Sequence, residues 1–184
     1  MLQKTENITW KGIENNTIEN CQVRWVNESI IVDSSIRGDV KNMDVAIDYT
    51  LRLNDKWVIK SFDLKSNINN SRWEIGLESD GEGRWGVYDE FMLFEPCIDI
   101  DISLSPFTNS LPINRVEFNL HQPVQLTILY IDVLEQKMFE DKQVYTKQGA
   151  TKFVFENDDR RFKAMLDVDR NGFVVHYPGL FFKS

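Results

Sequence analysis

Hydrophobic and polar residues alternate with a period of two along most of this chain. In DVAIDYTLRLN (residues 44–54), every second position from Val45 to Leu53 is apolar. This pattern predicts an antiparallel strand that is half buried, apolar on one face and largely polar on the other. KWVIKSFDLKS (56–66) predicts a second strand, and Asn54-Asp55 between the two predicts a hairpin turn.

The same alternation returns further along the chain, in segments separated by Gly, Asn and Asp turn signals. The segments are RWEIGLESD, VQLTILYI, KQVYTKQ, TKFVFEN, RFKAMLDVD and FVVHY. A turn roughly every ten residues is typical of a barrel, roll or sandwich. DVLEQKMFED (132–141) is the best helix candidate, although it also continues a strand. No linker or repeat divides the chain, so we expect a single domain over residues 1–184.

The composition and net charge exclude some classes of binding partner. The chain has 184 residues, 42% of them hydrophobic, and a net charge of −8. A surface this acidic repels phosphate backbones and anionic lipid surfaces, so we expect neither nucleic acid nor an anionic membrane as partner. No apolar run approaches the roughly 20 residues that span a bilayer. MLQKTENITW lacks the pattern of a signal peptide, and Cys21 and Cys97 then suggest free thiols in the cytoplasm.

Two short motifs resemble ligand loops but lack the required context. GEGRWG (81–86) has the glycine spacing of a dinucleotide fingerprint, yet Pro96 follows too soon for the helix that this site needs. We therefore interpret it as a glycine-rich hairpin turn with positive φ. DVDRNG (167–172) begins like a calcium loop, but its twelfth position is Pro178 instead of glutamate. An Asn171-Gly172 hairpin turn explains it better.

Candidates for catalysis are few. The two cysteines and two histidines are scattered singly, which does not suit zinc, and no nucleophile elbow is present. We expect no metal and no cofactor. The many Phe and Trp residues can stack on sugars or line a lipid cavity, but in a β domain they more often form the core.

CIDIDISLSPFTNSLPINR (97–115) is the stretch with the most candidate chemistry. Asp99 and Asp101 lie on the same face of one predicted strand, about 7 Å apart. They suit a shared cation or an acid/base pair, but a solvated outer face with the isoleucines inward is the favoured interpretation. Ser105-Pro106 ends the strand, and Thr108 and Asn109 close turns through their own side chains.

This stretch resembles the signature of the bacterial putative glycolipid-binding domain family, C-x-D-x-D-x-x-x-S-P-x-T-N-x-L-P-I-x-R. DGEGRW, QVYTK and LDVDRNGFVVHYPGLF occur in the order found in that family. The resemblance covers essentially the whole chain. It implies a mainly all-β fold, in which a single curved antiparallel sheet forms a β roll or incomplete barrel with at most one or two short helices. It also implies a shape similar to lipid and lipoprotein carriers, and no catalytic residues.

Three functions follow as expectations. In the first, a soluble non-enzymatic module encloses the acyl chains of a glycolipid or similar amphiphile. The polar motif then contacts the headgroup, through Asp99, Asp101, Ser105, Thr108, Asn109 and Arg115. In the second, Asp99, Asp101 and Arg115 share the cleft of a small-molecule hydrolase or isomerase, near Asp167, Asp169 or His176. The third is a cytoplasmic homo-oligomer that contacts other proteins through edge strands.

Arg115 itself has two interpretations that the sequence leaves open. It is close enough in the chain to reach Asp99 or Asp101 across the corner as a bidentate ion pair, which would be a structural latch. The same polar groups could also converge at the rim of an apolar cavity.

Overall fold

The computed structural model describes residues 4–87, 90–92, 96–157 and 161–184. Its strands pair in one continuous, 15-stranded sheet. The N-terminal strands are β1 (Lys4–Gly12), β2 (Asn16–Val26), β3 (Ser29–Val40), β4 (Met43–Asn54), β5 (Ile59–Ile68), β6 (Ser71–Ser79), β7 (Trp85–Val87) and β8 (Glu90–Met92). The C-terminal strands are β9 (Asp99–Ile102), β10 (Pro123–Asp132), β11 (Lys137–Gly149), β12 (Lys152–Asn157), β13 (Lys163–Val168), β14 (Val174–Tyr177) and β15 (Phe181–Lys183).

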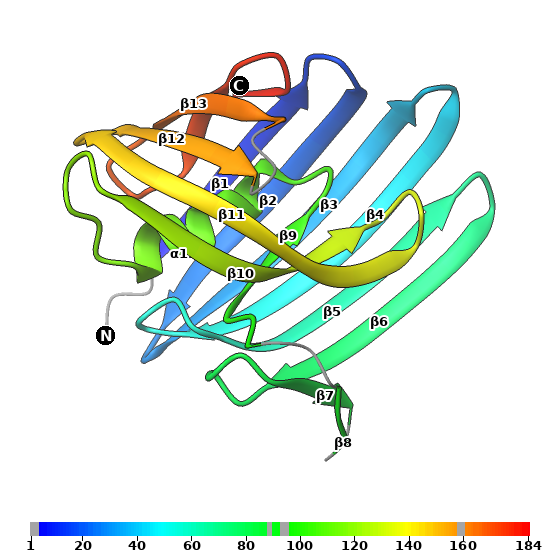
Figure 1. The fold of residues 1–184 in the computed structure, drawn as a ribbon. Helices are drawn as coiled ribbons and strands as arrows, with labels where there is room; N and C mark the ends of the chain where they lie inside the picture. Colours follow the sequence, from blue (N-terminus) through cyan, green and yellow to red (C-terminus); the bar gives the residue numbers. More distant parts are fainter. Residues whose placement is uncertain (1–3, 88–89, 93–95, 158–160) are drawn as a thin grey trace.

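The order of the strands in the sheet is β8 to β1, followed by β15 to β9. The first and last strands are therefore neighbours in the middle of the sheet, with Trp10 opposite Lys183. The sheet curves so that β10, β11 and β12 pass across the strands of the N-terminal half (Figure 1). A hydrogen bond of 3.1 Å from Gln136, between β10 and β11, to Ser71 of β6 ties the two layers together. This confirms the predicted β roll, an open curved sheet.

The predicted period-two alternation holds in the N-terminal half. In β4, the side chains of Val45, Ile47, Tyr49, Leu51 and Leu53 are all buried, and the residues between them are more exposed. In β10 the alternation fails, because Ile128, Leu129 and Ile131 are all buried. The strand lies between two clusters of buried side chains: Leu129 and Ile131 pack in one, and Leu126 packs against the other. Burial on both faces removes the alternation.

Two features of the connections differ from the expectations. β9 pairs with β10 in parallel, so the sheet is not purely antiparallel. A parallel neighbour requires a crossover, which a 3-10 turn η1 (Pro106–Asn109) and helix α1 (Ser110–Arg115) provide. Pro106 and Pro112 lie in the first turns of η1 and α1, where the backbone N–H that proline lacks is not needed for a helical hydrogen bond.

The helix candidate at 132–141 is instead the hairpin between β10 and β11. Among the described residues, no helix is long and apolar enough to cross a membrane.

The glycine-rich loop is a turn between β6 and β7, as predicted, and not a nucleotide site. Gly81 and Gly83 both have positive φ, of 85° and 100°. The Gly83 carbonyl accepts a hydrogen bond of 2.9 Å from the backbone N–H of Cys97. The Trp85 indole donates one of 2.7 Å to the Cys97 carbonyl. The loop therefore fixes the start of the stretch at 97–115.

Replacing Gly83 with alanine is expected to destabilise the protein by at least about 1–2 kcal/mol, since its φ is unfavourable for a residue with a Cβ. The added Cβ would also lie 2.7 Å from the backbone nitrogen of Cys97. Gly149→Ala is the matched control, because no atom lies within 4 Å of its added Cβ. Urea denaturation of both variants measures the difference. Equal stability of the two variants would contradict the role of this close approach.

Candidate functional site

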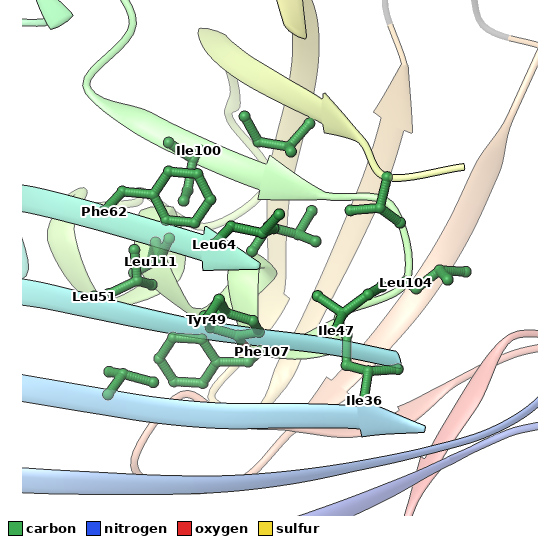
Figure 2. Packing of buried hydrophobic residues seen from close by; sticks show 14 of the residues in the cluster. Ile36, Ile47, Tyr49, Leu51, Phe62, Leu64, Ile100, Leu104, Phe107 and Leu111 are labelled. Atoms are coloured by element: carbon green, nitrogen blue, oxygen red, sulfur yellow. The ribbon is translucent and has the colours of Figure 1, made fainter. Parts of the chain in front are cut away.

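Residues 97–115 form a segment that lies between the two layers of the sheet, and we call it the central segment. Its apolar side chains Ile100, Leu104, Phe107 and Leu111 belong to one buried cluster with side chains of β4 and β5, among them Ile47, Leu51, Phe62 and Leu64 (Figure 2). The Phe107 ring also contacts Trp10 and Phe173, with centroids 6.4 and 6.1 Å away. The described side chains thus fill the space in this region where we expected the acyl chains of a lipid.

Asp99 is buried, contrary to the favoured prediction of a solvated face. Its side chain is 1% exposed, and it pairs with Arg115, which is 16% exposed. The guanidinium donates from Nε to Oδ1 at 3.0 Å and from an Nη to Oδ2 at 2.5 Å. Burial raises the pKa of the Asp99 carboxyl, and the hydrogen bond and charge of Arg115 oppose this rise. The pair joins the end of α1 to β9, so the structure contains the bidentate ion pair that a structural latch requires.

Asp101, two residues along β9, is half buried and has uncharged partners. Thr108 donates to its Oδ1 at 2.8 Å, and Gln143 of β11 donates to its Oδ2 at 2.7 Å. The Gln143 amide oxygen accepts a hydrogen bond from the Tyr145 hydroxyl at 3.3 Å, and that hydroxyl accepts one from Asn109 at 3.0 Å. This network connects the central segment with β11. Burial also raises the pKa of the Asp101 carboxyl.

Ser105 makes its contacts on the opposite side, with the N-terminal layer. Its hydroxyl lies 2.9 and 3.0 Å from the two carboxylate oxygens of Glu19 in β2. Glu19 is 2% exposed and also accepts hydrogen bonds from Tyr49 at 2.6 Å and Ser34 at 2.7 Å. Burial raises the pKa of Glu19 to about 7, although these hydroxyl donors lower it.

We did not predict Glu19 from the sequence. The signal that could have found it is the register of β2. Cys21 and Val23 are buried, so a period of two places Glu19 inward and Ile18 outward. Ile18 is indeed 43% exposed.

The polar network opens onto a pocket of about 350 Å³ between the central segment and the C-terminal strands. Its polar side chains include Asp101, Ser105, Asn109, Asp141, Gln143 and Asn157. Six aromatic rings also line it, those of Tyr130, Phe139, Phe155, Phe162, Tyr177 and Phe181. The volume falls in the range of small-molecule sites, and the mixture of rings with a few converging polar groups is typical of them.

The pocket brings together only part of the predicted site. Asp101, Ser105 and Asn109 line it, whereas Asp99, Thr108 and Arg115 are not among its lining residues. Thr108 acts through its hydrogen bond to Asp101. Three of the six residues predicted to bind a ligand thus line the pocket, while Asp99 and Arg115 pair with each other. Whether the pocket residues bind a ligand stays a prediction.

The residues proposed near an enzyme cleft lie elsewhere. Asp167 pairs with Lys152 at 2.5 Å and lies 3.7 Å from His176, on an exposed part of β13 and β14. Asp169 accepts hydrogen bonds from the backbone of Asn171 and Phe173, so DVDRNG forms a turn. Within the described ranges, no group of three or more His, Cys, Asp or Glu side chains is arranged to hold a metal ion.

Residues 7–183 match the protein family described as "Putative glycolipid-binding". The chain belongs to this family. A crystal structure of a DUF1089 family protein from Pseudomonas aeruginosa is similar to this chain, with a TM-score of 0.79 and 30% sequence identity. The similarity covers 90% of this chain and 91% of that one. No curated protein matches the sequence. The family membership confirms the resemblance that the central segment indicated.

Proposed function

We propose that this protein binds a glycolipid or similar amphiphile without catalysing a reaction, and that the ligand's polar headgroup occupies the pocket. The observation that carries the proposal is the pocket itself, in which Asp101, Gln143 and Asn157 face a set of aromatic rings. Rings stack on the apolar faces of sugars, and carboxylate and amide groups hydrogen-bond to hydroxyls. The family's description supports the same ligand class.

The apolar part of the ligand then lies at the mouth of the pocket and not between the layers, since the central segment fills that space. Phe139 supports this placement, because it lines the pocket and is nevertheless 44% exposed. Its ring packs against Tyr130, with centroids 5.2 Å apart. An exposed ring that is held in place by a neighbour suits contact with an alkyl chain.

A hydrolase or isomerase built on Asp99, Asp101 and Arg115 is less well supported. That mechanism needs the three side chains in one cleft, but Asp99 and Arg115 pair with each other outside the pocket lining. The cytoplasmic location, the single domain and the homo-oligomer stay predictions from the sequence.

Octyl β-glucoside below its micelle concentration is a suitable probe, because it joins a neutral sugar to an alkyl chain. We expect saturable binding by calorimetry, and we expect Phe162→Ala to weaken it roughly tenfold through the loss of one ring of the pocket. Phe182→Ala is the matched control, since Phe182 is 40% exposed and is not among the pocket-lining residues. Absence of binding, or an equal loss in both variants, would overturn the proposal.

A further inference from the structure

The two aspartates of β9 occupy equivalent positions on the strand, but only Asp99 has a positively charged partner. Asp99 and Asp101 are two residues apart on the same face of the strand. Arg115 neutralises Asp99 through two hydrogen bonds. The partners of Asp101, the Thr108 hydroxyl and the Gln143 amide, are both uncharged. Asp101 is also the one of the two that lines the pocket.

The surroundings of Asp101 add negative charge. Asp141 of β11 also lines the pocket, and its charge raises the pKa of Asp101 further. Among the described residues that line the pocket there is no lysine, arginine or histidine. A carboxylate that is removed from water without an opposite charge is unfavourable, and a cation that enters the pocket would relieve this.

The rings of the pocket suit a cation as well. The Phe162 ring centroid lies 6.0 Å from that of Phe155 in an edge-to-face arrangement, and 6.1 Å from that of Tyr177 in a tilted one. Tyr130 and Phe139 contribute a second pair of rings. The faces of aromatic rings carry partial negative charge and attract ammonium groups, more strongly where water is excluded. Rings around a carboxylate therefore favour an amine over a hydroxyl of the same size.

We propose that the headgroup of the ligand carries a protonated amine, which binds to Asp101 between the aromatic rings of the pocket. The inference rests on the proposed function, because it assumes that the pocket holds the headgroup. It narrows the ligand class to amphiphiles with an amine-bearing polar group, such as an amino sugar, and it disfavours anionic headgroups.

Three octyl glycosides test the inference on the wild-type protein: the glucoside, the 2-amino-2-deoxyglucoside, and its N-acetyl derivative. They are compared by calorimetry at about pH 6, where an amine of this kind is protonated. We expect the amino compound to bind roughly tenfold more tightly than the other two. Equal affinity of all three would overturn the amine while leaving the proposed pocket in place. Absence of binding by all three would instead overturn the proposed function.

Asp101→Asn locates the effect. The change keeps the size of the side chain and an oxygen that can accept from Thr108, but removes the charge. The ratio of the affinities for the amino compound and the glucoside should therefore fall to about one, whatever the change does to the affinity for the glucoside itself. Asp63→Asn, the same change at an exposed position of β5, should keep the advantage. An advantage that persists in Asp101→Asn would overturn the assignment to this residue. Circular dichroism verifies that both variants are folded.

Discussion

Arg115→Met is expected to lower the free energy of unfolding by about 3–5 kcal/mol. The substitution removes the guanidinium but keeps an apolar side chain of similar length. It leaves the Asp99 carboxylate, which is 1% exposed, without its ionic partner. Most of the cost comes from that uncompensated charge and not from the loss of an attraction. Urea denaturation near neutral pH measures it.

Two further variants test this explanation. Arg84→Met removes an arginine that pairs with Asp80 but is 62% exposed, so we expect a change of no more than about 1 kcal/mol. The double variant Asp99→Asn/Arg115→Met removes both charges and should recover part of the stability lost by Arg115→Met alone. A double variant that is less stable than Arg115→Met would show that the pair does not act as a charge-compensated latch.

Glu19→Gln is expected to remove a pH dependence of stability worth about 3 kcal/mol in the wild-type protein. The pKa of Glu19 is raised from 4.5 to about 7 by burial. Because the folded pKa is the higher one, the folded state binds the proton more tightly than the unfolded state does. The resulting stabilisation is complete below the unfolded pKa and is lost as the pH rises toward 7.

The measurement is a comparison of urea unfolding at about pH 5 and pH 8 for the wild-type protein and Glu19→Gln. Asp99 and Asp101 also have raised pKa values and shift stability in the same direction, but they are present in both proteins. The pH-dependent change in unfolding free energy that the wild-type protein shows and Glu19→Gln lacks is therefore due to Glu19. The glutamine oxygen can still accept from Tyr49 and Ser34, so the fold should be kept. If the unfolding free energy changed equally between the two pH values in both proteins, Glu19 would not be the titrating group.

The sheet was predictable because its signals are local. Alternation in β4 and the turns at Asn54 and Gly83 depend on residues close together in sequence, and the structure confirms them. The Arg115–Asp99 pair was recognisable as one of two possibilities, since the turn between them brings the ends of the central segment together. The burial of Asp99 could not be recognised from the sequence, because the layer that covers its face of the strand comes from strands distant in sequence.

The pocket is formed by residues far apart in the sequence, and for this reason it could not be predicted from the sequence. Asp101 contacts Gln143, 42 residues away, and Ser105 contacts Glu19, 86 residues away. No periodicity reports such pairs. A glutamate within a strand is normally predicted to face solvent, unless the alternation of the residues on either side places it on the buried face. The buried acid in β2 was missed for this reason.

The meeting of β1 and β15 in the middle of the sheet has a consequence for biosynthesis. While the chain is being made, β1 to β6 can pair as successive hairpins, but the free edge of β1 has to wait for Phe181–Lys183. An unpaired edge offers backbone N–H and C=O groups to any other extended chain. The interval between the synthesis of β1 and that of β15 is therefore a period in which this edge of the nascent chain is open to aggregation.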